Sequence, residues 1–323
     1  MEARIRMKHV ILDCDPGHDD VLALMMALYQ THDLDVTGVV TTAGNQSLSK
    51  VTHNAFNVLR YLHRDVPLVA GESGALLASQ TTTGDGDAIH GQSGLGGFEF
   101  QENTQWQSQV DHDYLHFYRG ELSAGPRTII ATAPLTNVAM VIKSMPELVK
   151  NIEEISLMGG GLHHGNITPA AEFNIYADPE AAKIVFNAGI PITMSGLDVT
   201  EKAFLTADEI RALGHGTGKA TTMVYHLLDF YSHYFTQQRV DEMPLHDVCA
   251  VLALTNPEMF TSIQTVVDVE TNDGIAKGQT IADLRVIQDA QQTKNVTALL
   301  SIDRQLFKEA LLKMLAHFDA DLA

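Results

Sequence analysis

The chain has 323 residues, of which 45% are hydrophobic and 19% are charged, the composition of an ordinary globular protein. Its 40 acidic against 21 basic residues give a net charge of -19, which argues against nucleic acid or an anionic membrane surface as the main partner. Two cysteines, Cys14 and Cys249, predict no disulfide framework, and no apolar run approaches the roughly 18 residues of a membrane span, so we expect a cytoplasmic protein.

Short apolar runs and segments of helical period alternate through the first part of the chain. Strands are predicted at 9–13, 34–42 and 66–71, and helices at 21–30 and 48–64. This alternation is typical of βαβ units, whose strands are parallel and whose helices cover both faces of the sheet.

The irregular stretch from Gly71 to Gln109 interrupts this alternation. It is rich in Gly, Ser, Thr and Gln, and it carries His90 close to several glycines. A long irregular stretch in a compact domain is usually functional or disordered. We interpret it as a mobile flap over a site rather than as a plain surface loop.

The alternation resumes after this stretch. Predicted strands and helices follow in the order 127–132, 134–145, 152–161, 178–189 and 190–196, with several helices between Ala207 and Leu254. Strands at 266–271, 280–287 and 295–303 are expected to pair partly antiparallel, before a closing helix from Gln305 to Ala316. We predict an α/β fold with a Rossmann-like open, mainly parallel sheet, helices on both faces and some antiparallel strands near the C-terminus. Because no linker or repeat divides the chain, residues 1–323 are predicted to form one domain.

The segment "VILDCDPGHDD" places Asp13, Asp15, Asp19 and Asp20 directly at the end of the first predicted strand. Clustered carboxylates in a partly desolvated cleft cannot all stay ionised without a compensating cation. Asp19 and Asp20 could also be simple helix-start residues, which the helix dipole favours. With Asp15 beside them at a strand's carboxyl end, where open α/β sheets bind ligands, a cation site is the better interpretation. Oxygen ligands alone favour calcium or magnesium over zinc.

"PLHDVCA" supplies a further carboxylate, Asp247, at a predicted helix start. His246 precedes it and could be an ordinary buried histidine. Paired with a carboxylate beside a second helix terminus, His246 becomes a candidate general acid or base.

Five segments together resemble the nucleoside hydrolases (nucleoside N-ribohydrolases), in that family's order and rough spacing from Val10 to about Leu254. They are "DCDPGHDD", "GNQSLSKVTHNA", "ATAPLTNVA", "MGGG" with "TPAAEFNIYADPEAA", and "PLHDVCA". The resemblance implies hydrolysis of the N-glycosidic bond of a ribonucleoside to ribose and free base, in nucleoside salvage or catabolism. "PLHD" and "TPAAEFNIYADPEAA" look closest to the bacterial pyrimidine-preferring branch.

The resemblance also implies a calcium ion held by Asp15, Asp20, Asp247 and the carbonyl of Thr132, with Asp15 as general base. An attacking water would approach an oxocarbenium-like ribose from the face opposite the base, and its proton would pass to Asp15. A homo-oligomer, dimer or tetramer, is implied by the resemblance only.

Further residues match the family's sugar and base ligands. The ribose hydroxyls are assigned to Asp19, Asn45 and Asn174, the 5′-hydroxyl to Asn166 and Glu172, and the lining of the sugar pocket to Met158. His246 and His90, with Tyr231 and Tyr234, are expected on the base side. Taken alone, Asn45 and Asn166 could be turn residues, and "MGGG" could be a phosphate loop, although no Lys follows it. Glu172 and Asn174 would project to one side if their segment is extended.

Two other functions compete with this interpretation. An apolar run into D-x-D also opens the haloacid-dehalogenase-type, magnesium-dependent phosphatases, in which Asp13 would be the nucleophile, but Gly17 stands where that pattern expects Thr or Val. A non-catalytic nucleoside-binding protein is the second alternative. Binding alone would not require a carboxylate held against an activated water.

Overall fold

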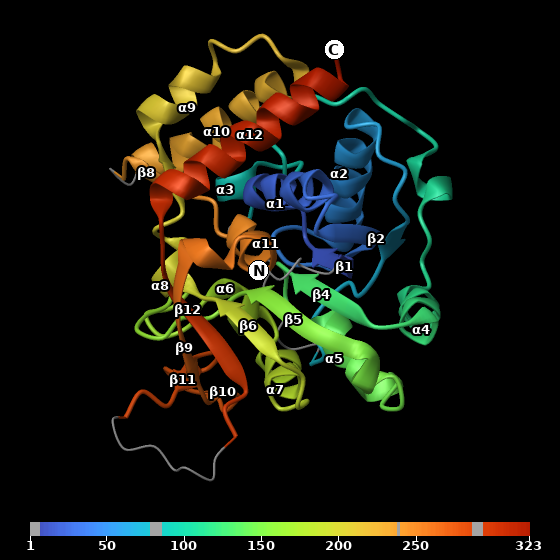
Figure 1. The fold of residues 1–323 in the computed structure, drawn as a ribbon, viewed down its shortest axis with the longest axis vertical. Helices are drawn as coiled ribbons and strands as arrows, with labels where there is room; N and C mark the ends of the chain where they lie inside the picture. The colour runs from blue at the N-terminus through green and yellow to red at the C-terminus, as the bar shows by residue number, and fades with distance from the viewer. Residues whose placement is uncertain (1–6, 78–85, 238–239, 286–292) are drawn as a thin grey trace, which may run out of the picture.

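A single large sheet organises the described part of the protein. The computed structural model describes residues 7–77, 86–237, 240–285 and 293–323 (Figure 1). Within these residues, eight strands have the order β3-β2-β1-β4-β5-β6-β12-β9, and two small antiparallel sheets pair β7 with β8 and β10 with β11. The strands are β1 (Lys8–Cys14), β2 (Leu34–Thr41), β3 (Leu68–Ala70), β4 (Arg127–Ala131), β5 (Ile152–Met158), β6 (Ile192–Ser195), β7 (Phe204–Thr206), β8 (Glu242–Pro244), β9 (Phe260–Thr265), β10 (Val267–Val269), β11 (Thr280–Ala282) and β12 (Val296–Ile302).

The predicted sheet is confirmed. Every neighbouring pair from β3 to β12 is parallel, and only the edge strand β9 is antiparallel, to β12. The strand order reverses direction between β1 and β4. This reversal is the topological switch point, where open α/β sheets bind their ligands outside the carboxyl ends of the strands.

Helices cover both faces of the sheet, as Figure 1 shows, with α1, α2, α10 and α12 on one side and α5 and α7 on the other. The helices are α1 (His18–Tyr29), α2 (Leu48–Tyr61), α3 (Gly86–His90), α4 (Tyr114–Ala124), α5 (Thr136–Ser144), α6 (Phe173–Ala177), α7 (Pro179–Phe186), α8 (Leu197–Thr200), α9 (Ala207–Leu213), α10 (Lys219–Gln237), α11 (Val248–Thr255) and α12 (Arg304–Asp321), with short 3-10 helices at Trp106–Gln109, Val149–Asn151 and Pro257–Met259. None of the helices in the described ranges is both long and apolar enough to cross a membrane.

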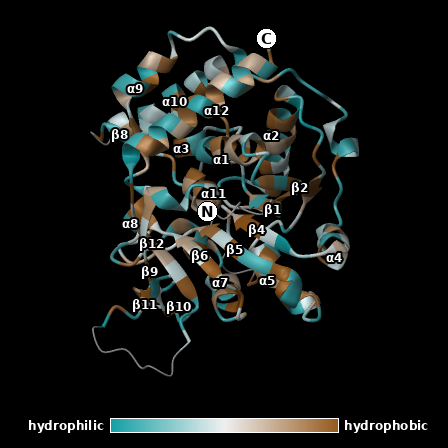
Figure 2. Cartoon of the chain, viewed as in Figure 1, coloured by the Kyte–Doolittle hydropathy of each residue, from teal (hydrophilic) through white to brown (hydrophobic). Residues whose placement is uncertain are grey.

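Side-chain alternation along β1 divides the core in two. Val10, Leu12 and Cys14 belong to one buried cluster and Ile11 to the other, because successive strand residues point to opposite faces. Figure 2 shows the central strands β1 and β2 as largely apolar, whereas α9 and α12 carry alternating polar and apolar bands. Helices of that banded kind cover a core with one face and meet solvent with the other.

Helix α1 is buried from His18 to Leu28, and α10, α11 and α12 contact it. A helix that is apolar nearly all round is stable only when it is enclosed on every side. The acidic start of α1 is therefore carried by one of the best-packed elements of the fold.

Several elements differ from the prediction. The edge strand β9 has alternating half-exposed, polar residues and no apolar run, so the sequence did not indicate it. The stretch 71–109 contains α3 and a 3-10 helix, and part of it, 78–85, lies outside the described residues. The predicted strand 280–287 is a strand only at Thr280–Ala282, and residues 286–287 also lie outside the described residues.

A buried acid anchors the middle of the sheet. Asp13 is 1% exposed and accepts hydrogen bonds from the Tyr118 hydroxyl at 2.9 Å and from Nδ2 of Asn137 at 3.2 Å. Burial raises the pKa of Asp13 to about 7, while the two donors act against that rise.

We expect Tyr118→Phe to lower the free energy of unfolding by about 1–3 kcal/mol, because a buried acceptor then loses a donor that water cannot replace. Urea denaturation measures this loss. Tyr114→Phe is the matched control, since the Tyr114 hydroxyl donates to Glu72, which is only partly buried and can be hydrated. An equal loss in both variants would contradict this account of Asp13.

Candidate functional site

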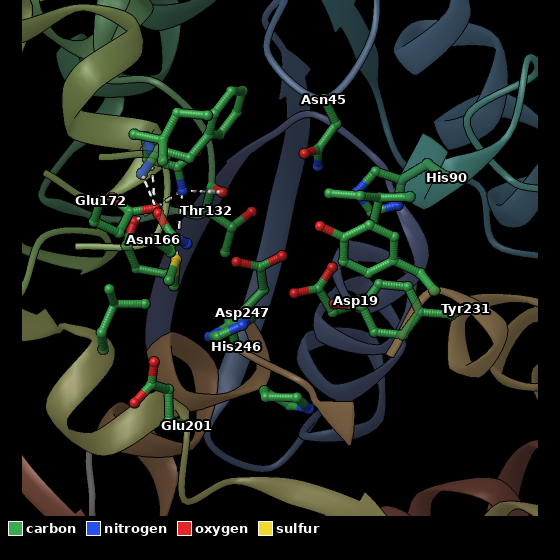
Figure 3. A pocket seen from close by; sticks show the side chains of 18 of the residues that line it. Asp19, Asn45, His90, Thr132, Asn166, Glu172, Glu201, Tyr231, His246 and Asp247 are labelled. Atoms are coloured by element: carbon green, nitrogen blue, oxygen red, sulfur yellow. Dashed lines mark hydrogen bonds between the residues drawn. The ribbon is translucent and has the colours of Figure 1, made fainter. Parts of the chain in front are cut away.

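A cavity of about 490 Å³ opens at the carboxyl ends of β1, β4 and β5 (Figure 3). This volume is within the usual range for small-molecule sites. It is lined by Asp19, Asn45, Ile89, His90, Thr132, Met158, Asn166, Ile167, Glu172, Phe173, Asn174, Leu197, Glu201, Tyr231, Tyr234, Phe235, Pro244, His246 and Asp247. All of the predicted site residues except Asp15 and Asp20 therefore line one cavity beside the switch point.

The turn after β1 carries Asp19, which lines the cavity, and the fully buried Asp15 and Asp20, which both contact the lining residue Asn45. Pro16 and Gly17 end the strand, and Gly17 becomes the N-cap of α1. Gly17 is required for close approach, because a Cβ there would lie 2.7 Å from Cε1 of His90. Gly44 faces a similar limit, with Oδ2 of Asp15 only 2.1 Å from the position of its Cβ.

The carboxylates converge as the sequence predicts, with one difference in membership. Oxygen atoms of Asp19, Asp20 and Asp247 all lie within 4.8 Å of one another. Asp15 is not part of this compact group, although its charge acts on Asp247. Asp19, which the sequence assigns to the ribose, lies inside the group.

Asp20 is satisfied by several hydrogen-bond donors, whereas one carboxylate oxygen of Asp15 has none among the described residues. Asp20 accepts from the Thr132 hydroxyl at 2.9 Å, from the Gly17 amide at 3.0 Å and from Nδ2 of Asn45 at 3.0 Å. Asp15 accepts from the Asn45 amide through Oδ2, whereas its buried Oδ1 has no hydrogen-bond partner in the described structure. A buried carboxylate oxygen without a donor is costly unless a cation or a ligand satisfies it.

The electrostatics of the cluster favour a cation. Burial raises the pKa of Asp19 to about 7 and of Asp20 to about 6. Burial also raises the pKa values of Asp15 and Asp247 well above the ordinary value, with repulsion between the carboxylates adding to both. None of the described residues that line the cavity is Lys or Arg. The N-termini of α1 and α11 supply only partial positive charge. A hard divalent ion with oxygen ligands fits this donor set of buried carboxylates.

Asn174 ties three parts of the floor together. Its Nδ2 donates to the Thr132 carbonyl at 3.0 Å, to the Met158 carbonyl at 3.2 Å and to the Met158 sulfur at 3.4 Å. The Thr132 carbonyl, which the family resemblance assigns to the metal, is thus bonded to Asn174. Because the amide nitrogens of Asn45 and Asn174 are used within the protein, their carbonyl oxygens are the groups left for a ligand.

Glu172 and Asn174 do share the cavity, but their segment is not extended. Glu172 is the N-cap of α6, and its carboxylate accepts from the backbone amides of Asn174 at 2.9 Å and Gly160 at 2.8 Å. Burial raises the pKa of Glu172 to about 7 despite these donors. Asn166 lies at the exposed rim, where its Oδ1 accepts from the Phe173 amide at 2.9 Å.

His246 lies beside the carboxylates, as Figure 3 shows. Its Nδ1 is 2.8 Å from the Thr200 hydroxyl, so Nε2 is the nitrogen left for the cavity. Burial lowers the pKa of His246 to about 4, which favours the neutral ring.

The opposite wall is aromatic. His90 and Tyr231 are both buried there, with ring centroids 5.9 Å apart and planes at 15°, while Tyr234 is partly exposed on the same helix α10. Burial lowers the pKa of His90 well below its ordinary value, and the neighbouring His18 lowers it further. The predicted flap residue His90 therefore forms part of the wall, while motion of the flap stays a prediction.

Glycines seat the segment that carries His90 against α10. A Cβ on Gly96 would lie 2.4 Å from Cζ of Phe230, and one on Gly97 would lie 2.3 Å from the carbonyl oxygen of His226. Gly97 also has φ +98, which favours glycine. We refer to residues 91–97 and Phe230 together as the glycine seat.

Sequence reasoning missed several lining residues and two neighbours. Ile89, Glu201 and Phe235 line the cavity, and Thr200 contacts His246 from outside the lining. None of these four carries a motif signal, because they come from helices that no pattern linked to the site. His18 lies inside the quoted "DPGHDD" motif, and its contact with His90 depends on tertiary structure. Asp13, the nucleophile of the phosphatase alternative, is hydrogen-bonded to Tyr118 of α4 and Asn137 of α5, and it does not line the cavity.

Comparison with protein families gives a match over most of the chain. The family described as inosine-uridine preferring nucleoside hydrolase matches residues 10–309. The chain is 39% identical over 315 residues to proteins named pyrimidine-specific ribonucleoside hydrolase RihA, from Shigella boydii and from Escherichia coli strain K12. Each alignment covers 96% of this chain and 98% of the relative.

Solved structures give a concordant match. A purine-preferring ribonucleoside hydrolase from Gardnerella vaginalis has a TM-score of 0.88 at 29% identity, covering 97% of this chain and 99% of that one. The plant nucleoside hydrolase PpNRh1 has a TM-score of 0.84 at 30% identity, covering 96% of this chain and 99% of that one.

Proposed function

The chain belongs to the inosine-uridine preferring nucleoside hydrolase family, and from this premise we propose that it is a calcium-dependent, pyrimidine-preferring member. As a ribonucleoside hydrolase, it acts on N-glycosyl compounds. The observation that carries the proposal is the group of buried carboxylates at the floor of a cavity of suitable volume. The pyrimidine preference is supported by the higher identity to the pyrimidine-specific relatives than to the purine-preferring structure.

Asp15, Asp20, Asp247 and the Thr132 carbonyl would hold the ion, with Asp19 close enough to share in binding. When bound, the ion supplies positive charge that lowers the pKa of a coordinated water and orients the sugar hydroxyls. Calcium is preferred over magnesium because it accepts more ligands in a less regular geometry, which suits a crowded carboxylate group.

The roles of the protein groups follow from the side-chain oxygens that are not used in hydrogen bonds within the described part of the protein. The unpartnered Oδ1 of Asp15 is available to accept a proton from the attacking water. The carbonyl oxygens of Asn45 and Asn174, with Asp19, would accept from ribose hydroxyls, and Glu172 with Asn166 from the 5′-hydroxyl. Met158 would pack under the sugar. Holding the sugar by so many groups sets its orientation and conformation, which contributes much of the rate in such reactions.

The base would lie against the aromatic wall. Tyr231 and Tyr234 would stack on it or hydrogen-bond to it, while His246 and His90 would contact its polar edge. His246 has Nε2 free for a departing base, because Thr200 occupies its other nitrogen. The substrate is therefore expected to span the cavity from the carboxylates to α10.

The cellular setting is part of the proposal. Both cysteines are free and buried, which suits a reducing cytoplasm. A role in nucleoside salvage or catabolism follows from the products, ribose and a free base. A dimer or tetramer is expected from the family resemblance, and analytical ultracentrifugation would measure it.

We expect the purified protein to hydrolyse uridine and cytidine with kcat/KM at least about tenfold above inosine and adenosine, the scale on which one pocket separates related ligands. Release of ribose from each of the four nucleosides measures this. Equal or higher values for the purines would remove the pyrimidine preference. Release of phosphate from nucleotides without base release from nucleosides would instead favour the phosphatase alternative.

A further inference from the structure

His18 is a buried histidine whose contacts the proposed function does not use. It is the first residue of α1, and its ring is stacked between neighbours, with centroids 5.2 Å from His90 at 16°, 5.6 Å from Phe230 at 8° and 5.4 Å from Tyr231 at 19°. Its Nε2 lies 3.0 Å from the Gly96 carbonyl oxygen, and its Nδ1 lies 3.0 Å from Nδ1 of His90.

The first of these contacts determines the protonation of His18. A carbonyl oxygen only accepts, so Nε2 of His18 must carry a hydrogen. The ring is fully buried and is surrounded by aromatic rings, an environment in which a neutral imidazole is favoured over an imidazolium. In the neutral ring with Nε2–H, the Nδ1 atom has a lone pair.

The second contact then determines the tautomer of His90. Two lone pairs facing each other at 3.0 Å would repel, so Nδ1 of His90 must carry the hydrogen that His18 accepts. The backbone amide of His18 also points at Nδ1 of His90, at the longer distance of 3.4 Å, and it could donate there only if that nitrogen carried no hydrogen. The shorter 3.0 Å contact between the two rings, in which the neutral His18 ring has no hydrogen to give, favours the hydrogen on Nδ1 of His90.

The other ring nitrogen of His90, Nε2, remains available to a ligand. This nitrogen has no hydrogen bond to any described residue, and the ring lines the cavity. With the hydrogen fixed on Nδ1, Nε2 offers a lone pair to whatever occupies the cavity.

We propose that His18 is a positioning residue that holds His90 in the Nδ1–H tautomer, so that Nε2 of His90 accepts a hydrogen bond from an N–H group of the bound base. The base as ligand rests on the proposed function, whereas the tautomer does not. Uracil, cytosine and hypoxanthine all offer an N–H group on the ring or as an amine. In this state His90 accepts a hydrogen bond from the base and does not protonate it. Proton donation to the departing base is then left to His246 or to water.

The tautomer can be observed without any substrate. Two-dimensional ¹⁵N NMR of histidine-labelled protein distinguishes protonated from bare ring nitrogens, and the His90 signals are assigned by their loss in His90→Gln. We expect hydrogen on Nδ1 of His90 and on Nε2 of His18. Hydrogen on Nε2 of His90, or on both nitrogens of His18, would overturn the proposal whatever the enzyme hydrolyses.

Two variants of similar polarity separate the contacts of His18. Asparagine places an amide oxygen near the Nδ1 position and can still accept from His90, but it cannot reach the Gly96 carbonyl. Glutamine reaches the Nε2 position and can still donate to Gly96, but it offers no acceptor at Nδ1. His18→Asn should therefore keep the His90 tautomer, and His18→Gln should lose it.

We expect the kinetic losses to follow the loss of the His90 tautomer, so that glutamine at position 18 is more damaging than asparagine. His18→Gln should lower kcat/KM for uridine by about 10–100-fold, the usual cost of losing a group that orients a site residue, mainly by raising KM because the contact forms on binding. His18→Asn should retain most of the activity. His53→Gln, which alters a stacked histidine on Trp106 outside the cavity, is the control and should match the unmodified protein.

A purely structural role for His18 predicts the opposite order. If His18 only anchors the glycine seat through Gly96, glutamine would be the milder change and asparagine the more damaging one. That order, or equal losses with an unchanged His90 tautomer, would refute the positioning role. If no nucleoside is hydrolysed at all, the proposed function fails while the NMR result still decides the tautomer.

Discussion

Asp15→Asn is expected to lower the turnover number for uridine by at least about a hundredfold while leaving nucleoside binding in place, the usual scale for removal of a general base. The amide is nearly the same size as the carboxylate, but it cannot take the proton of an attacking water. The buried, unpartnered Oδ1 of Asp15 is the atom that makes this residue available for that step. Initial rates at saturating uridine, with binding of the substrate measured by calorimetry, test the expectation.

Asp13→Asn is the matched control, because the two acids lie two residues apart on the same strand end and both are buried. Both oxygens of Asp13 accept hydrogen bonds, from Tyr118 and Asn137, whereas Oδ1 of Asp15 is unpartnered among the described residues, so the Asp13 amide variant should change turnover little, provided that thermal unfolding shows a folded protein. Near-normal turnover in the Asp15 variant would refute the role of Asp15. Loss of uridine turnover in a folded Asp13 variant alone would contradict this assignment of the two acids.

Removing the metal ion is expected to lower turnover by a similar factor and to lower the melting temperature. Asp19, Asp20 and Asp247 lie within a few ångströms of one another, and no described lining residue is a basic Lys or Arg to offset them. An ion present at a hundred times its dissociation constant stabilises the folded state by about 2.7 kcal/mol, and chelation removes that contribution. Calorimetric melting and uridine hydrolysis should fall together, and added calcium should restore both.

The metal content must be measured in the same samples by elemental analysis. Calcium-saturated chelator serves as the control, because it exposes the protein to the reagent without removing the ion. Full activity with verified absence of metal would remove the ion from the mechanism. Restoration by magnesium to the same level as calcium would keep a divalent ion but remove the preference for calcium.

The order and direction of the main strands could be predicted because the apolar runs that form them are short, continuous and separated by helical periods. Strands buried on both faces, such as β1, give this signal strongly. The edge strand β9 could not be predicted, since its residues are polar and half-exposed and its only reason to be extended is its neighbour β12. The short helix α6 was also not predicted, because its five residues are too few to show a helical period.

The site residues also fall into two groups, those that local sequence could predict and those that only the folded structure brings together. Asp15, Asp20 and Asp247 stand next to strand ends or helix starts, where local sequence already dictates position, and their place beside one cavity could be expected. The pairing of His18 with His90 joins residues 72 positions apart in sequence and depends on how α1 packs against the segment before Gly91. No periodicity encodes such a contact, so only the folded arrangement reveals it.

The glycine seat has a practical consequence for redesign. Because Gly96 and Gly97 fit against one aromatic ring and one backbone carbonyl, the wall that meets the base is assembled from two chain segments that must match each other. Grafting a different α10 onto this scaffold to change which nucleosides it accepts should succeed only when residues 91–97 are transplanted with it. Libraries that vary α10 alone would mostly sample proteins in which His90 has lost its place.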